Sequence, residues 1–199
     1  MTSLKSIASG DSCNEGRVSF PLHLGTHVDA PRHFDSQGPT VEMYAADFWH
    51  ATNVYLLDVP AEPQQVIGLS EVSRFLDQIP ADCEFLLVRT GAEAYRQNRP
   101  EIYSASGPCL GDDFAEWLRS QRNLRFVGVD SISVSSMLHR ALGRRTHSEL
   151  LAKSGRPPVL IVEDMHLSEL QVSPHEAWVH PLRVDGADGS PVTVVARID

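Results

Sequence analysis

Short apolar runs alternate with segments of helical periodicity, and this alternation limits the folds open to the sequence. Apolar side chains recur at the i, i+3, i+4, i+7 spacing of an amphipathic helix over 69–79 and again over 112–122, with a weaker pattern over 144–153. Ser70 and Asp112 are placed to cap the first two helices. The apolar runs have the length and β-branched content of buried strands: Val54–Leu57, Phe85–Val88, Phe126–Val129 and Val159–Val162. The alternation predicts an α/β fold with some parallel strand pairing.

The end of the chain predicts a closing β-hairpin. Residues 178–184 and 191–198 have the pattern of two strands, and the residues between them are rich in Asp and Gly. No linker, repeat or charge block divides the 199 residues, a length that is typical of one domain. We therefore expect a single domain over residues 1–199.

Charge and cysteine content exclude several classes of function. The chain has 17 Lys and Arg against 26 Asp and Glu, a net charge of −9, so we expect neither a nucleic-acid nor a membrane partner. Cys13, Cys83 and Cys109 form no C-x-x-C pair, which argues against a disulfide framework or a zinc ribbon. The sequence shows neither a signal-peptide core nor a run of about 20 apolar residues. These features predict a cytoplasmic protein.

The segment from His23 to Phe34 concentrates groups that bind metal ions. It holds three of the nine histidines, whereas an even distribution would place about half a histidine in eleven residues. Gly25 and Pro31 oppose a helix, and in an extended chain the odd-numbered positions share one face. The potential ligands at those positions are His23, His27, Asp29 and His33. Full extension would separate the outer two by about 33 Å, so we expect bends at Gly25 and Pro31.

Imidazole nitrogens and a carboxylate in this arrangement favour a divalent cation. Zn²⁺, Mn²⁺ and Fe²⁺ all accept such ligands. The competing interpretation is a solvated, histidine-rich turn. The number and spacing of the ligand groups favour the metal site.

The pattern His-x-Gly-Thr-His-x-Asp-x-Pro-x-His-Phe resembles the signature of the cyclase-like metal-dependent hydrolases, which include bacterial kynurenine formamidases and isatin hydrolases. Similar segments continue along the chain almost to its end: Arg89-Thr90-Gly91 with Tyr95, Gly107-Pro108 with Leu110, Val129-Asp130-Ser131, His147-x-x-Leu150-Leu151 with Glu163, and Gly186-Ala187-Asp188-Gly189-Ser190-Pro191. The resemblance implies an α/β fold with a mixed, partly barrel-like central sheet and flanking helices. It also implies a homodimer or higher homo-oligomer.

The resemblance implies a role for each residue of the site. The implied ligands are His23, His27 and Asp29 for the first of two divalent cations and His147 for the second, with Asp29 and Glu163 bridging them. His33 would be the acid/base residue. Zn²⁺ is the expected ion, with Mn²⁺ or Fe²⁺ as alternatives. Thr26 and Asp130 are candidates for hydrogen bonds that support the ligands.

The implied activity is cleavage of a small amide by a metal-activated water, as in an N-formylkynurenine formamidase (arylformamidase) of tryptophan catabolism. One alternative is an isatin-type ring-opening hydrolase, or a cyclase or dehydratase of secondary metabolism, acting through the same metal site. An alternative of another class is a metal-binding protein without catalysis. A serine hydrolase is not expected, because the sequence has no Gly-x-Ser-x-Gly.

Two departures from the family pattern affect the substrate and the site. The family usually opens with a Trp-Pro-Gly-Asp-like segment that contacts substrate, and residues 1–19 contain none. Asp164 stands where Asn commonly follows the bridging Glu. Neither departure removes an implied ligand, but the first leaves the substrate open.

Overall fold

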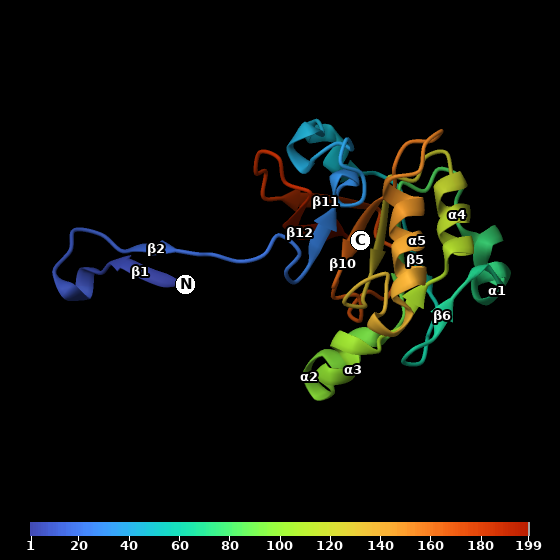
Figure 1. Ribbon diagram of the computed structural model, residues 1–199, viewed down its shortest axis with the longest axis horizontal. Helices are drawn as coiled ribbons and strands as arrows, with labels where there is room; N and C mark the ends of the chain where they lie inside the picture. Colours follow the sequence, from blue (N-terminus) through green and yellow to red (C-terminus); the bar gives the residue numbers. More distant parts are fainter. Residues whose placement is uncertain (199) are drawn as a thin grey trace.

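The structure, a computed structural model, describes residues 1–198 and centres on an eight-stranded mixed sheet. The strands follow the order β4-β11-β12-β3-β10-β9-β7-β5 and curve into a nearly closed barrel (Figure 1). Their bounds are β3 (His27–Asp29), β4 (His50–Ala51), β5 (Val54–Asp58), β7 (Phe85–Arg89), β9 (Phe126–Val129), β10 (Leu160–Glu163), β11 (Glu176–Pro181) and β12 (Gly189–Arg197). The expected α/β fold with a mixed, partly barrel-like sheet and flanking helices is confirmed.

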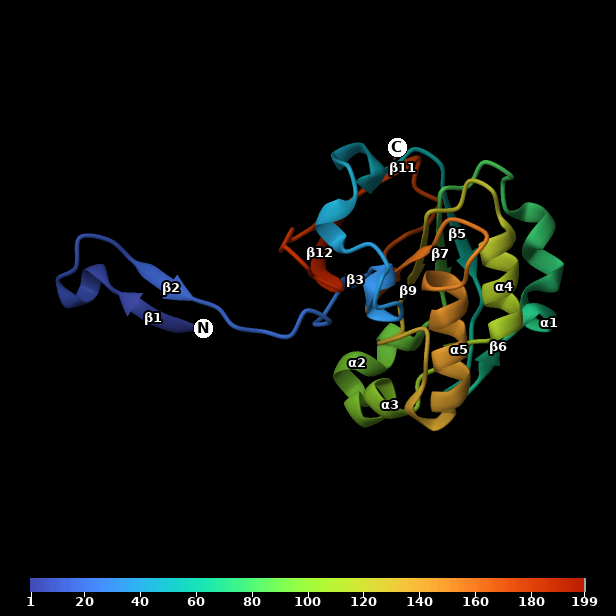
Figure 2. The same ribbon diagram turned by 45° about the horizontal axis from the view of Figure 1, so that its top comes forward.

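Helices cover one face of the sheet. Because the sheet curves, its own hairpin of β11 and β12 packs over the other face. Figure 2 shows α4 (Asp112–Ser120) and α5 (Arg140–Leu151) side by side, with α1 (Leu69–Val72) beyond α4. One apolar cluster lies under these helices, and a second lies under the hairpin. The remaining short elements of the body are β6 (Val66–Ile67), β8 (Cys109–Leu110), α2 (Tyr95–Asn98) and α3 (Pro100–Ala105).

The parallel half of the sheet consists of β5, β7, β9 and β10. These strands coincide with the four predicted apolar runs, displaced by at most one residue at either end. Strands of a parallel sheet are buried on both faces, which explains why they appear in the sequence as continuous apolar runs. The predicted pairing of the last two strands is also confirmed, because β11 and β12 are antiparallel.

The predicted helices form, but their starting points differ from the prediction. Gly68 and Gly111 are the N-caps, and not Ser70 and Asp112. The two glycines end the paired strands β6 and β8 and lie so close that a Cβ on Gly111 would stand 3.0 Å from the Cα of Gly68. Strand pairing therefore sets the start of both helices. The first helix continues as a 3₁₀ turn over Ser73–Gln78, and α5 begins four residues before the predicted 144.

A buried arginine on α4 fixes the end of α5. Arg119 is 5% exposed, and its guanidinium donates hydrogen bonds to four backbone carbonyls, those of Glu149, Leu150, Lys153 and Arg156. The last carbonyls of a helix have no partner within the helix, and Arg119 binds those of Glu149 and Leu150, the second of which also accepts from the Val159 amide. The contact ties α5 to α4 and keeps α5 against the sheet.

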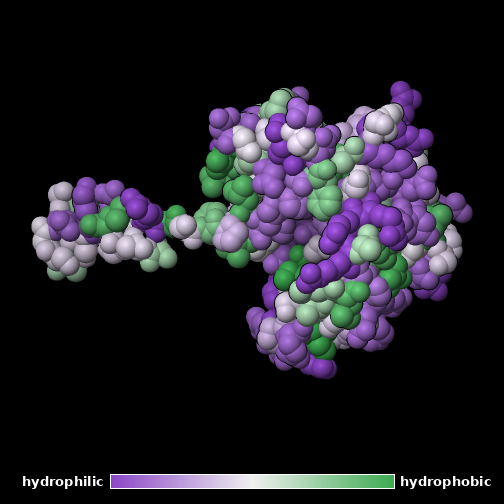
Figure 3. Space-filling model, viewed as in Figure 1, coloured by the Kyte–Doolittle hydropathy of each residue, from purple (hydrophilic) through white to green (hydrophobic). Residues whose placement is uncertain are grey.

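Residues 1–20 form an arm outside the body. Strands β1 (Thr2–Lys5) and β2 (Glu15–Arg17) pair as an antiparallel hairpin, and Figure 3 shows the arm joined to the body by a thin neck. We predicted a single domain over residues 1–199, and whether the arm belongs to that domain stays a prediction. Asp199 lies outside the described residues. Across residues 1–198, no helix has the length and apolar content to cross a membrane.

Candidate metal centre

Strand β3 carries the centre of the site because it lies between β10 and β12. His27 and Asp29 are two residues apart in the strand, so both side chains point to the face that α5 covers. Glu163 ends β10 directly opposite His27 and therefore shares that face. His147 reaches the same point from the middle of α5. All four side chains are buried.

The predicted bends on either side of β3 are present. Gly25 adopts a φ of +60°, a left-handed conformation that glycine tolerates best. Pro31 opens a 3₁₀ turn that ends at His33. The ring centroids of His23 and His33 are consequently 4.2 Å apart. The segment thus folds back on itself, as its glycine and proline predict.

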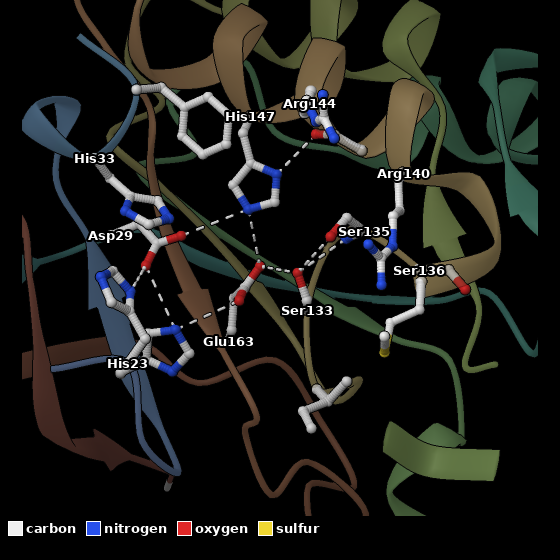
Figure 4. A pocket seen from close by; sticks show the side chains of 15 residues that line it. His23, Asp29, His33, Ser133, Ser135, Ser136, Arg140, Arg144, His147 and Glu163 are labelled. Carbon is white, nitrogen blue, oxygen red and sulfur yellow. Dashed lines mark hydrogen bonds and ion pairs between the residues drawn. The ribbon is translucent and has the colours of Figure 1, made fainter. Parts of the chain in front are cut away.

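Two histidines each face both carboxylates at nearly equal spacing, and Figure 4 shows Asp29, His147 and Glu163 turned toward one another. His27 Nε2 lies 3.4 Å from Asp29 Oδ1 and 3.4 Å from Glu163 Oε2. His147 Nε2 lies 3.4 Å from Glu163 Oε1 and 3.6 Å from Asp29 Oδ2. These separations exceed a normal N–H···O hydrogen bond. They match the distance of about 3.3 Å between ligand atoms that surround a zinc ion tetrahedrally at about 2.0–2.1 Å.

The other ring nitrogens of the two buried histidines support the same interpretation. Nδ1 of His27 donates to the Gly25 carbonyl at 2.8 Å, and Nδ1 of His147 donates to the Gly143 carbonyl at 2.8 Å. These bonds leave Nε2 of each ring facing the carboxylates, which is the arrangement typical of histidines that bind metal. The donor set present in the chain therefore fits a divalent cation.

Asp29 belongs to both groups of side chains that could hold an ion. One group comprises His27, Asp29 and Glu163, and the other comprises His23, Asp29 and His33. His23 Nδ1 lies 2.7 Å from Asp29 Oδ1, which is a hydrogen-bond distance. The structure thus brings together all six residues singled out from the sequence. Their individual roles as ligands or as acid/base group stay predictions.

The buried ionisable groups of the site shift one another's pKa values. Burial alone lowers the pKa of His27, but the adjacent negative charges of Asp29 and Glu163 outweigh it and raise the pKa to about 10. Burial lowers the pKa of His147 as well, and Glu163 and Asp29 again raise it overall. Burial raises the pKa of Asp29, whereas its histidine neighbours bring it well below the usual range. Two buried carboxylates thus require positive charge, either protons or metal.

Asp188 is a site residue that reasoning from the sequence missed. Its Oδ2 lies 2.9 Å from His33 Nδ1 and 3.3 Å from His23 Nε2. The adjacent Gly189 makes room for this cluster, because a Cβ there would stand 2.4 Å from the His23 ring. The available signal was the Gly-Ala-Asp-Gly-Ser-Pro segment, which resembles the family without indicating what its aspartate contacts.

Thr26 and Asp130 do not bond to the predicted ligands, contrary to expectation. Thr26 Oγ1 donates to the Asp164 carbonyl at 2.7 Å. Asp130, fully buried, accepts hydrogen bonds from the amide and hydroxyl of Thr90 and from the amide of Gly91. The Asp130 side chain therefore shapes the Arg-Thr-Gly turn. Asp130 follows a strand, and from the sequence alone a residue at that position could equally support the turn or the metal ligands.

The structure accounts for Asp164 in the position where Asn is common. Asp164 has a φ of +56°, a conformation that Asn and Asp adopt more readily than other residues with a Cβ. Its carboxylate pairs with Arg96 at 2.7 Å and accepts a hydrogen bond from Tyr103. Arg96 also donates to the Met165 carbonyl. The added charge of Asp164 is therefore balanced, and the turn after Glu163 is held in place.

The centre opens into a cavity of about 520 Å³ that a small molecule could fill. Phe34 forms part of its wall and stacks on His147, with ring centroids 4.8 Å apart. Ile132 and Met137 add apolar surface, and Arg140 and Arg144 of α5 add positive charge. The cavity therefore combines a floor of candidate metal-binding groups with apolar and basic walls.

We predict that Gly143→Ala weakens metal binding about 10- to 100-fold. A Cβ at this position would stand 2.2 Å from the Cβ of Ser135, so α5 and Ser135 must separate, which displaces His147 on the same helix. Metal affinity by calorimetry tests this, with the exposed Ser148→Ala on the same helix as control. Unchanged affinity in Gly143→Ala would show that α5 does not need this close approach.

We also predict opposite pH behaviour for metal-free and metal-loaded protein. Protonated His27 stabilises the metal-free fold fully below its ordinary pKa of 6.5, and this contribution disappears as pH rises through about 10. Metal binding requires deprotonated histidine and strengthens over the same range. Thermal melting from pH 7 to pH 9.5 should therefore show a falling Tm after chelation and a steady or rising Tm with metal. Parallel pH curves for the two forms would contradict this assignment.

Known proteins resemble this chain in sequence and in fold. Residues 4–136 match the family described as "Putative cyclase". Kynurenine formamidases of Bacillus cytotoxicus and Bacillus anthracis are 32% and 31% identical to it, over 94% of this chain and 81% of theirs. Isatin hydrolase A from Ralstonia solanacearum shares the fold with a TM-score of 0.77 at 21% identity, covering 98% of this chain and 79% of that structure. The chain therefore belongs to the cyclase family and is a hydrolase of that family.

Proposed function

We propose that this protein is a metal-dependent amidohydrolase and that N-formylkynurenine is its substrate. The observation that carries the proposal is the convergence of two buried histidines and two buried carboxylates beside a His–Asp pair, all facing one cavity. The relatives named kynurenine formamidase, at 31–32% identity, support this choice of substrate.

We propose two divalent cations at the centre, with Zn²⁺ as the preferred ion. The residues that would hold them are His23, His27, Asp29, His147 and Glu163. Asp29 is shared by both groups of candidate ligand atoms, which supports a bridging role. Cations held there would supply a Lewis acid that polarises a carbonyl and lowers the pKa of water. Metal analysis of the purified protein with stoichiometry tests this count.

We propose that His33 moves a proton during the reaction. Its Nδ1 donates to Asp188 Oδ2, which leaves Nε2 available as the proton acceptor and donor. Asp188 holds the ring in one orientation. In amide cleavage, His33 would take a proton from the attacking water and deliver it to the leaving nitrogen. His33 lies in the cavity wall, 6.2 Å between ring centroids from His147.

We predict that His33→Ala lowers kcat about 10²- to 10⁴-fold on N-formylkynurenine without changing metal content. Asp188→Asn should have a smaller effect in the same direction, because the imidazole remains but loses its charged partner. Formate release measures turnover, and exposed His180→Gln serves as control. Full turnover in His33→Ala would show that His33 is not the acid/base group, whereas no turnover in the metal-loaded wild-type protein would favour a metal-binding protein without catalysis. Ring opening of isatin in place of formate release would move the substrate to the isatin type.

We also propose that the chain forms a homodimer or higher homo-oligomer through its N-terminal arm. An isolated two-stranded hairpin is at most marginally stable in water. The arm exposes large apolar side chains at Met1, Leu4, Ile7, Val18 and Phe20. Contact with a second copy of this chain would cover them and give the hairpin the partner surface that its own body does not provide.

Removal of residues 1–18 is expected to convert the oligomer to a monomer. Light scattering coupled to size exclusion measures the mass, and a circular dichroism spectrum with metal content checks that the body remains folded. An unchanged oligomeric mass would show that the copies associate elsewhere.

A further inference from the structure

We propose that Arg140 and Arg144 form an anion-binding wall in the cavity, which holds the substrate's carboxylate remote from the scissile amide. The inference rests on the proposed amide hydrolysis and assigns the residues that would recognise the carboxylate of N-formylkynurenine. The placement of the two arginines in the cavity and their lack of protein partners carry it.

The two arginines lie on the helix face that carries His147. Positions 140, 144 and 147 follow the i, i+4, i+7 spacing, and all three line the cavity. Figure 4 shows Arg140 extending from α5 beside Ser135 and Ser136. At 1.5 Å per residue, Arg144 and Arg140 stand about 4.5 and 10 Å along the axis from His147. A ligand held by its amide at the metal centre would therefore place a group several bonds away beside them.

Neither arginine is engaged by the protein itself. Within residues 1–198, no carboxylate lies at ion-pair distance from Arg140 or Arg144, and neither guanidinium donates a hydrogen bond to a protein group. The neighbouring Arg145 differs, because it pairs with Asp112 at 2.6 Å and does not line the cavity. On α5, Arg145 thus pairs with a residue of α4, whereas Arg140 and Arg144 line the cavity.

The charge of the chain gives these arginines a specific use. The net charge of −9 opposes the approach of an anionic ligand, and two unpartnered guanidinium groups at the cavity provide a local attraction. A guanidinium group binds a carboxylate through two parallel hydrogen bonds. Phe34, which forms part of the cavity wall, provides a surface for an aromatic ring. The fitting ligand is a small aromatic amide with a carboxylate.

A matched pair of substrates tests the inference. 4-Formamidobenzoate and 4-formamidobenzamide have the same formamide and ring, and only the first carries a charge. The wild-type protein is expected to prefer the carboxylate at least tenfold in kcat/KM. The double variant Arg140→Gln/Arg144→Gln should lose that preference, and Arg145→Gln, which removes the same charge from the same helix, should keep it. Higher ionic strength should reduce the preference.

Binding of the amine products gives a readout that does not depend on turnover. Chelated wild-type protein should bind 4-aminobenzoate more tightly than 4-aminobenzamide in calorimetry, and the double variant should bind both equally. Equal kcat/KM for the two formamides, or a preference that persists in the double variant, overturns the inference and leaves amide hydrolysis standing. Hydrolysis of neither formamide, together with arginine-dependent binding of 4-aminobenzoate, overturns the hydrolysis and supports the anion wall.

Discussion

The pairing of three-residue strand β3 with β10 on one side and β12 on the other is the constraint on which the structure depends. It joins the parallel half of the sheet to the closing hairpin. Val28 points into the apolar cluster under the hairpin and is fully buried, whereas its two neighbours face the opposite side. Strand alternation therefore separates an apolar anchor from the candidate metal-binding groups within three residues. A slip of one residue in register would exchange the two and destroy both core and site.

The same pairing concentrates negative charge where water is excluded. Asp29 and Glu163 are brought together in the sheet interior, and their mutual repulsion is offset by the histidines that approach from β3 and α5. Removing charged groups from water costs several kcal/mol each unless opposite charge compensates. A cation bound to these groups would therefore also stabilise the fold.

The sequence correctly predicted those features whose cause lies within a short segment of the chain. Gly25 and Pro31 required bends, and the four apolar runs required buried strands, so both follow from short segments. Glu163 and His147 could be assigned only through the resemblance, since nothing in their own neighbourhoods distinguishes them from ordinary surface groups.

Contacts between distant segments were beyond the reach of that reasoning. Asp188 meets His33 across 155 positions in the chain, and the partner of Asp164 is Arg96. The helix caps were mispredicted for the same reason, because the pairing of β6 with β8 displaced them onto Gly68 and Gly111. Side chains on separate elements meet only after the sheet order is fixed.

The position of β12 has a consequence for the order in which the site can form during synthesis. The histidine-rich segment is synthesised long before one of its two strand neighbours, which begins only at Gly189. Until that strand has been made, the nascent chain carries the candidate metal-binding groups without the strand that pairs with β3 on that side. A nascent chain that has not reached Gly189 therefore has no closed site for a cation.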